Sequence, residues 1–423
     1  MLILKKLKEK IPLWKDEIIN INKFHGNKII SECSVSQAYG GVRGVKSIIC
    51  DTSVVEPDKG LIIRGIPVLN LIDKLPEEIF YLLCTGEIPN KEELKDLQNE
   101  FSSRARIPSY VWDVLKSMPK DSHPMVMLDI AILVMQKESV FTKNYSKGIA
   151  KTEYLEPTLE DALNLLAKLP SIAAGIYRIR FNKGDIVNFD DNLDWGASYA
   201  KMLGFNDENF IKLIRLYLVL HCDHESGNAS QNSCNIVSSA LSDVYYAVSA
   251  GLNGLAGPLH GLANQECLKF ILSINEKYKG IPDEEELKRY LRGILSDGRV
   301  IPGYGHAVLR VTDPRFTAFM NFGDKMNLND NTFKIVKKLY KIVPNILKET
   351  GKAKNPWPNV DAASGALLYH FGLKEFDYYT VLFAVSRTMG MLSQIILNRS
   401  LGMPIIRPKS VSTEWIKEFV SKN

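Results

Sequence analysis

The sequence predicts a mainly α-helical fold with one small β-hairpin, and three observations support this. Apolar residues recur at three- and four-residue spacing along most of the chain, which is the period of an amphipathic helix. Strand signals occur in one short region only. The chain has 423 residues, 45% of them hydrophobic and 24% charged, so it can form a large core. We therefore expect helices packed in layers.

The predicted helices follow in order along the chain. The second is preceded by Asn90, three residues before Glu93, and this spacing is a helix-start signature in which each side chain bonds the other residue's backbone. The clearest helical segments are Glu78–Leu83, Glu92–Phe101, Leu159–Leu169, Asn209–Leu220, Thr332–Leu347 and Tyr378–Leu397.

The predicted hairpin lies near the amino end. Ser47–Cys50 and Leu61–Arg64 are rich in isoleucine, and the turn residues 56–60 (Glu-Pro-Asp-Lys-Gly) lie between them. Further along, charged stretches at 276–289 and 324–330 indicate that the middle third forms a separable subdomain. A cleft between two domains would suit a site that closes around its substrates.

Composition argues against several classes of protein. The apolar run Met125–Met135 is eleven residues long and contains Asp129, so it is too short and too polar to cross a membrane. The net charge of +5 comes without a basic cluster interleaved with aromatic residues, which disfavours nucleic-acid binding. Six cysteines without a C-x-x-C pair indicate reduced thiols. We expect neither membrane insertion nor nucleic acid as a partner.

Three turns carry the candidate chemistry. Gly-Pro-Leu-His-Gly at 257–261 contains His260, Pro-Gly-Tyr-Gly-His at 302–306 contains His306, and Pro-Asn-Val-Asp at 358–361 ends in Asp361. Glycine and proline let the backbone bend sharply and approach a ligand. Two histidines and a carboxylate can remove a proton from carbon and stabilise the enol that results. This pattern favours carbon–carbon bond chemistry.

Each of these residues has a local setting that suggests a role. His260 precedes a helix predicted to begin near Leu262, and the helix dipole would lower the pKa of the imidazole and keep it neutral. The glycines around Tyr304 would free backbone amides to line a ligand such as an adenine or a phosphate. Asp361 follows a proline-braced loop, where it could be a base or a helix N-cap.

Cationic residues surround these turns in the sequence. Arginine forks match carboxylates and phosphates, and a buried arginine needs a carboxylate from the protein or from a ligand. Two histidines with Arg315, Arg387 and Arg407 would form a coherent site for a small dicarboxylate. Lys352 and Lys354 would suit a polyanionic ligand.

A second cluster, His221-Cys-Asp-His-Glu225, ends an apolar helix. Four potential metal ligands lie within five residues, which admits a metal-dependent hydrolase. His221 and His224 are three residues apart, however, and do not make the H-E-x-x-H arrangement of a zinc site. His224 at a helix end could instead bind a substrate anion.

Together these motifs resemble the citrate synthases of the eukaryotic mitochondrial type, and the resemblance spans essentially the whole chain. It implies a multi-helical fold with a large domain (residues 1–261 and 373–423) and a small domain (262–372). The matching strings lie at 39–46, 51–54, 218–225, 253–266, 301–315, 351–361 and 407–410.

The resemblance also implies an activity, the condensation of acetyl-CoA with oxaloacetate and water to citrate and CoA. Asp361 would remove the methyl proton of acetyl-CoA, His260 would stabilise the enol, and His306 would polarise the oxaloacetate carbonyl. No cofactor is implied, because acetyl-CoA is a substrate. The implied oxaloacetate ligands are His224, Arg315, Arg387 and Arg407, and the implied CoA contacts are Arg43, Arg310, Lys352 and Lys354.

The resemblance further implies a homodimer in which Arg407 reaches the partner's site, and it favours the mitochondrial matrix. The first ten residues are basic and amphipathic, but acidic residues come early and no arginine precedes Arg43, so they indicate a first helix more than a transit peptide. Two related alternatives stay open: a 2-methylcitrate synthase that uses propionyl-CoA, and a filament-forming structural homologue.

Overall fold

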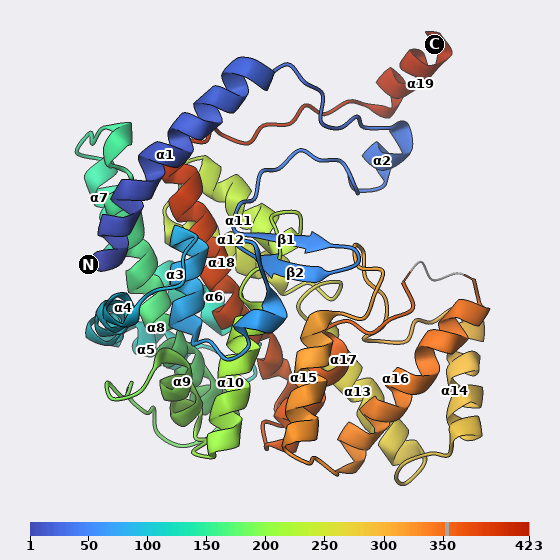
Figure 1. Cartoon of the computed structure of the whole chain (residues 1–423). Helices are drawn as coiled ribbons and strands as arrows, with labels where there is room; N and C mark the ends of the chain where they lie inside the picture. The colour runs from blue at the N-terminus through green and yellow to red at the C-terminus, as the bar shows by residue number, and fades with distance from the viewer. Residues whose placement is uncertain (352–354, 423) are drawn as a thin grey trace.

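The computed structural model describes residues 1–351 and 355–422. The chain is mainly helical, as expected, with one small antiparallel sheet (Figure 1). Its elements are α1 (Leu2–His25), α2 (Val35–Tyr39), β1 (Ser53–Glu56), β2 (Gly60–Ile63), β3 (Ile66–Pro67), α3 (Pro76–Thr85), α4 (Lys91–Arg104), α5 (Ser109–Ser117), α6 (Pro124–Val134), α7 (Val140–Tyr145), α8 (Leu155–Phe181), α9 (Trp195–Leu203), α10 (Glu208–His221), α11 (Ala229–Ser239), α12 (Val244–Leu255), α13 (Ala263–Lys277), α14 (Glu284–Ser296), α15 (Pro314–Lys325), α16 (Asn331–Glu349), α17 (Asp361–His370), α18 (Tyr379–Leu401) and α19 (Thr413–Lys422).

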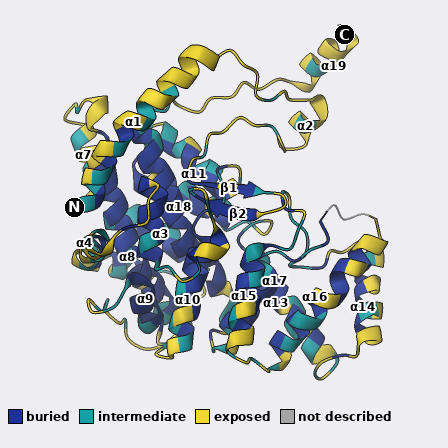
Figure 2. Cartoon of the chain, in the orientation of Figure 1, coloured by how far each residue is buried: buried dark blue, intermediate teal, exposed yellow. Residues whose placement is uncertain are grey.

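Helix α18 is the centre of the core. It packs against α3, α8, α10, α11 and α12, and it lies in the interior of the buried body in Figure 2. The stretch 376–401 is long and apolar enough to pass a membrane-span test by length and composition, but its most apolar window is entirely buried inside the protein. This is the pattern of a core helix, since a helix that is hydrophobic on all sides must be surrounded.

Helices α13 to α17 pack on one another on one side of the molecule (Figure 1). Their amphipathic character explains this: α14 buries Leu287, Leu291 and Ile294 on one stripe and exposes charged residues on the other. The predicted division into a large domain (1–261 and 373–423) and a small one (262–372) stays a prediction.

The six clearest helix predictions are confirmed. They fall within α3, α4, α8, α10, α16 and α18, except that Tyr378 ends the 3-10 turn before α18. The structure extends most of them, because capping residues and tertiary packing, more than the apolar period, set where helices end.

The hairpin prediction is right about the turn and wrong about the first strand. Strand β1 is Ser53–Glu56 and pairs antiparallel with β2 from Glu56↔Gly60 to Ser53↔Ile63. Residues 47–50 form no strand, and Ile48 and Ile49 are exposed. A short loop requires the paired strands to start right beside it, so the isoleucines upstream lie too far from the turn.

Two segments leave the body of the molecule. Helix α1 packs through Ile3, Leu7 and Ile11, which confirms a helix at the start of the chain. The chain from 26 to 50, with α2, and the segment from 403 to 422, with α19, then extend outward together (Figure 1). Tyr39 Oη donates to Thr413 Oγ1 at 3.0 Å and joins them. Both segments are mostly exposed in Figure 2.

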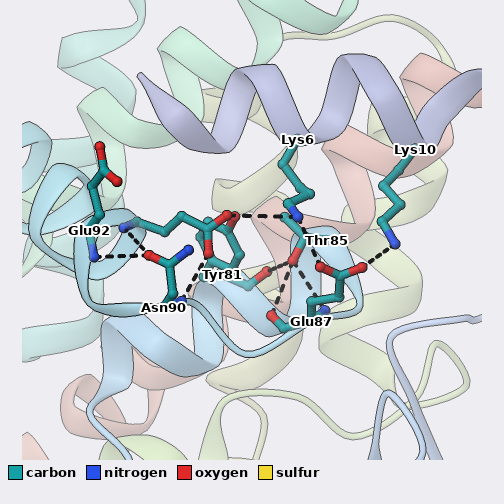
Figure 3. Close-up of polar contacts among 8 residues, drawn as sticks. Lys6, Lys10, Tyr81, Thr85, Glu87, Asn90 and Glu92 are labelled. Carbon is teal, nitrogen blue, oxygen red and sulfur yellow. Dashed lines mark hydrogen bonds and ion pairs between the residues drawn. The ribbon is translucent and has the colours of Figure 1, made fainter.

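Polar contacts join α1, α3 and α4 (Figure 3). Lys6 Nζ donates to Glu87 at 3.0 Å, and Lys10 pairs with the same carboxylate. Asn90 Oδ1 accepts from the Glu92 and Glu93 amides at 2.9 and 3.0 Å, while Glu93 accepts from the Asn90 amide at 2.9 Å. The predicted helix-start signature is therefore confirmed.

We predict that Asn90→Ala lowers the free energy of unfolding by about 1 kcal/mol, because two amides of the first turn of α4 lose their acceptor. Urea unfolding followed by circular dichroism measures the loss. Asn345→Ala, an exposed position inside α16, is the matched control and should change little. Equal stability of the two variants would contradict the prediction.

Candidate active site

The side chains predicted to carry the chemistry come from separate elements. His224 lies in the loop after α10, His260 in the turn between α12 and α13, and His306 in the loop before α15. The ring centroids of His224 and His306 are 5.4 Å apart. His260 lies 6.0 Å from the ring of Phe383, and the Arg387 guanidinium lies 4.8 Å from the same ring. The fold thus gathers residues that are far apart in sequence.

The loops that carry His306 and Asp361 are joined by backbone hydrogen bonds. The Gly305 amide donates to Trp357 O at 3.0 Å, and the Asn359 amide donates to Gly303 O at 2.9 Å. The left-handed φ of +81° at Gly303 allows this close approach, and a Cβ there would lie 2.7 Å from the sulfur of Cys267. The glycine amide at 305 is therefore engaged in the protein, contrary to the expectation that it lines a ligand.

His306 is set up as a neutral hydrogen-bond donor. The amides of Val308 and Leu309 donate to its Nδ1 at 3.1 and 3.0 Å, so the ring hydrogen must be on Nε2. Burial, with a further contribution from the Arg315 charge, lowers the pKa of His306 to about 4. At neutral pH the residue can therefore offer Nε2–H to a carbonyl oxygen.

His260 is also neutral, although the main cause differs from the expected one. Burial first, and then the charge of Arg387, lowers its pKa to about 4. Its Nε2 lies 2.9 Å from Ser230 Oγ, which also reaches Asn228 Oδ1 at 2.8 Å. This hydroxyl has one hydrogen: when it donates to Asn228 Oδ1, the ring hydrogen of His260 is on Nε2, and when it turns to Nε2, Nδ1 carries the proton and becomes the donor.

Asp361 is the first residue of α17 and does not act as its cap. Val360 is the N-cap, and the Asp361 amide donates to Asn359 Oδ1 at 3.0 Å. Burial raises the pKa of Asp361 to about 6, and Arg315 opposes the rise. A carboxylate with a raised pKa is a stronger base than an ordinary aspartate and is still mostly ionised at neutral pH.

Two arginines place positive charge in the core. Arg315, at the start of α15, is 4% exposed and forms an ion pair with Asp313 through Nε and Nη2, the latter at 2.7 Å. Arg387, in the middle of α18, is 1% exposed and donates from Nε to His221 O at 2.9 Å. Its Nη1 has no hydrogen-bond partner among the described residues, so it is available to a ligand anion.

The candidate metal ligands at 221–225 do not converge. His221 stacks on Tyr217 at 4.0 Å with Nδ1 against the Tyr217 carbonyl, whereas His224 faces His306. Within residues 1–351 and 355–422, no group of three His, Cys, Asp or Glu side chains is placed to hold a metal ion. Burial, and then the charges of Arg315 and Arg387, lower the pKa of His224 well below its usual range.

Five predicted ligands of the CoA and oxaloacetate substrates are bonded within a loop, exposed on outlying segments or outside the described residues. Arg310 Nη1 bonds carbonyls of its own loop, and its amide donates to Pro57 O in the hairpin turn at 2.7 Å. Arg43 and Arg407 are exposed on the two segments that leave the body. Lys352 and Lys354 lie outside the described residues.

Sequence reasoning missed three side chains that shape this site. They are Phe383, whose ring lies beside His260 and Arg387, Asp313, which pairs with Arg315, and Ser230, which contacts His260. The Asp-Pro-Arg order at 313–315 was a usable signal, because aspartate before proline is typical of a helix start. Phe383 and Ser230 carry no such signal.

These features define a class of enzyme. Neutral histidine donors, an aspartate of raised pKa and unpaired arginine hydrogens can together form an enol, stabilise it and hold an anionic acceptor beside it. The site is therefore suited to joining two carbon atoms through an enol.

Comparison with known proteins identifies the family. The family model for the citrate synthase C-terminal domain matches residues 41–409. The chain is 47% identical over 424 residues to citrate synthase, mitochondrial, of Saccharomyces cerevisiae, covering 98% of this chain and 88% of that protein. It is 46% identical over 427 residues to a probable citrate synthase, mitochondrial, of Glossina morsitans morsitans, covering 98% and 92%.

A solved structure agrees on the fold. The ternary complex of carboxymethyl coenzyme A and oxaloacetate with citrate synthase from Thermoplasma acidophilum has a TM-score of 0.77 at 23% identity, covering 90% of this chain and 97% of that one. The chain belongs to the citrate synthase family, and it is an enzyme of the acyltransferase type. Its nearly full-length similarity to citrate synthases supports citrate synthase activity. The alternatives, a 2-methylcitrate synthase that uses propionyl-CoA, a filament-forming structural homologue and a metal-dependent hydrolase, are less well supported.

We predict that kcat/KM for acetyl-CoA falls about tenfold per pH unit below about pH 6, because protonated Asp361 (pKa about 6) cannot accept a proton. His260 and His306 stay neutral down to about pH 4, so they add no step in this range. Initial rates in a constant-ionic-strength buffer give the profile, with circular dichroism confirming the folded state. A pH profile of kcat/KM that stays flat down to about pH 5 would contradict the assignment of Asp361 as the base.

Proposed function

We propose that this chain condenses acetyl-CoA with oxaloacetate and water, releasing citrate and CoA, with Asp361 as the base. The observation that carries the proposal is the combination of an aspartate with a raised pKa and two histidines held neutral beside buried arginines. The Thermoplasma structure, a complex with oxaloacetate and a CoA derivative, supports these two substrates.

The proposed first step forms the enol. Asp361 removes a methyl proton of acetyl-CoA while His260 donates from Nδ1 to the thioester oxygen. A thioester is a weak carbon acid, so the base requires this donor, and a single oxyanion donor contributes about 3 kcal/mol. Donation from Nδ1 requires that the single hydroxyl hydrogen of Ser230 turns from Asn228 Oδ1 to Nε2 of His260, which lies 2.9 Å from the hydroxyl oxygen.

The proposed second step forms the carbon–carbon bond. The Nε2–H of His306 polarises the oxaloacetate carbonyl as the enol carbon attacks it. Arg387, with a free Nη1, and Arg315 hold the two carboxylates of oxaloacetate, and His224 contacts it from the adjacent loop. Water then hydrolyses the citryl thioester. Closure of residues 262–372 against the rest of the chain would exclude bulk water during these steps.

We further propose that CoA is held by cationic side chains and that no cofactor takes part. Arg310 lies in the loop after His306, beside the hairpin turn, where it could meet a phosphate. Arg43, Lys352 and Lys354 would add positive charge. Both similar proteins are named mitochondrial, and we propose the mitochondrial matrix as the compartment of this chain.

The working form that we propose is a homodimer. Arg407 is exposed on a segment that leaves the body. It is therefore better placed to reach the site of a second copy than to reach Arg315 and Arg387 of its own chain, which are buried. The same segments expose large apolar side chains, Ile29 at 78% and Ile405 at 60% among them, which a partner would cover. Each site would then be complete only in the dimer.

We predict that Asp361→Asn reduces oxaloacetate-dependent thiol release from acetyl-CoA by about a hundredfold to ten-thousandfold, because the base is lost and the shape is kept. Release of CoA thiol is followed with a colorimetric thiol reagent, with propionyl-CoA in parallel. Asp121→Asn, at an exposed position, is the control. A fully active Asp361→Asn, or a preference for propionyl-CoA in the unchanged protein, would refute the assignment.

We also predict that two inactive variants restore each other. In a mixed dimer of Asp361→Asn and Arg407→Gln chains, one site receives both wild-type residues and the other neither. Random mixing should then give about a quarter of the wild-type rate, since half of the dimers are mixed and one site in two is intact. The variants are mixed after mild dissociation and assayed for thiol release. Absence of recovery, with mixed dimers verified by mass, would place Arg407 in its own chain's site.

A further inference from the structure

The carboxylate of Asp223 lies beside His224 and has no role in the chemistry described above. Asp223 is fully buried (0% exposed) and accepts three side-chain hydrogen bonds. Thr52 and Ser53 donate hydroxyl hydrogens to Oδ2, at 2.5 and 2.9 Å, and Gln394 Nε2 donates to Oδ1 at 3.2 Å. Burial raises the pKa of Asp223, and the hydroxyls of Thr52 and Ser53 and the charge of Arg387 oppose the rise, so they favour the ionised carboxylate.

These bonds join the loop of His224 to two other parts of the fold. Thr52 and Ser53 lie at the start of the hairpin, and Gln394 lies in α18. On the other side of His224, Glu225 has a left-handed φ of +58° and is held by its amide to Ser53 Oγ at 2.8 Å and by Oε1 to the Val55 amide at 2.6 Å. His224 is thus fixed between two acidic residues that are both tied to β1.

Helix α18 presents one face to this loop. Arg387 Nε binds His221 O at 2.9 Å, and the Gly390 amide donates to Cys222 O at 3.0 Å. A Cβ at position 390 would lie 2.6 Å from Asp223 Oδ1, so the carboxylate rests directly on the helix backbone. One turn further along, Gln394 also accepts from Ser226 at 2.7 Å and from Asn235 at 3.0 Å.

The charges of this arrangement are complementary. No carboxylate forms an ion pair with Arg387 among the described residues, and the negative charge that acts on it most strongly is that of Asp223. The charge of Arg387 acts in turn on Asp223. A buried guanidinium without any nearby anion would be costly. Asp223 balances this cation without a direct hydrogen bond to it, and Nη1 is left for the substrate.

We propose that Asp223 is a positioning residue for oxaloacetate: with Thr52, Ser53 and Gln394 it fixes the His224 loop and balances the buried charge of Arg387. The inference rests on the proposed function, because it assigns oxaloacetate to His224 and Arg387. It predicts an effect on one substrate only, since the CoA-binding residues lie on other segments.

The first test is Asp223→Asn. The amide group keeps the shape but loses the charge. Its NH2 group must face either a hydroxyl or the NH2 of Gln394, and these groups donate hydrogen bonds to Asp223 in the unchanged protein. We expect KM for oxaloacetate to rise about tenfold or more, the usual effect of losing a hydrogen bond to a charged group. KM for acetyl-CoA should stay nearly constant. Steady-state thiol release with each substrate varied in turn gives both constants.

The second test exchanges the two groups. In the double variant Asp223→Asn with Gln394→Glu, the carboxylate moves to α18 and the amide to the loop, so a hydrogen bond between them can form again. We expect the double variant to recover most of the lost oxaloacetate affinity, which a general loss of packing would not allow. Gln394→Glu alone places two carboxylates together, and its oxaloacetate KM should therefore worsen as pH rises.

The matched control is Glu77→Gln. Glu77 is equally buried (1% exposed) and accepts the Trp195 amide at 2.8 Å, but it belongs to the contact between α3 and α9. It should leave both KM values unchanged. If Asp223→Asn does not fold, Thr52→Val replaces it, because this variant removes one of the donors to Asp223. The same measurements then test the positioning role, with a smaller expected rise of KM for oxaloacetate.

The outcomes separate the two proposals. Oxaloacetate binding is measured independently of turnover, as the increase of Tm that it causes. A wild-type protein without oxaloacetate-dependent thiol release would overturn the proposed function. Wild-type turnover together with unchanged oxaloacetate KM and unchanged Tm increase in Asp223→Asn would overturn the positioning role alone. A rise of KM for acetyl-CoA in Asp223→Asn that is as large as the rise of KM for oxaloacetate would also overturn the positioning role.

Discussion

Arg387 lies in the middle of α18, a helix that is buried along nearly its whole length. Much of the surrounding structure serves to stabilise the positive charge of this side chain. Polar groups must surround a buried guanidinium, because its loss of hydration is otherwise uncompensated. The carbonyl of His221 accepts from it, and Asp223 lies close enough to balance its charge. The chain from α10 into the His224 loop is therefore held tightly to α18, and its position determines where the oxaloacetate half of the site can be.

The same buried, cation-rich environment shifts the pKa values of the proposed catalytic groups in the directions that the proposed chemistry requires. Burial disfavours the charged form of any group, so it lowers the pKa of His260 and His306 and raises that of Asp361. The nearby arginines lower the histidine values further and limit the rise at the aspartate. One environment thus produces neutral donors and a base near neutral pH. This pairing is what enol formation needs.

The two halves of the site differ in how they are held. The proposed oxaloacetate half is built on α18 and on loops that buried hydrogen bonds hold in place. The proposed CoA contacts lie on exposed loops and on segments that leave the body. A rigid anion site beside a more open second site fits an order in which oxaloacetate binds first and acetyl-CoA follows.

Much of this protein was readable from its sequence, because periodic patterns and special residues report local geometry. The helical segments, the capping box at Asn90, the hairpin turn and the histidine and aspartate turns are all local features, and the structure contains them. The strand at 47–50 was placed wrongly because isoleucine content says nothing about pairing register. Tertiary structure alone decided that Asp361 is no cap, that Gly305 serves loop-to-loop bonding, and that Phe383, Ser230 and Asp223 belong to the site. Those contacts join residues up to about 170 positions apart, and such distances depend on how the helices pack, which no local pattern encodes.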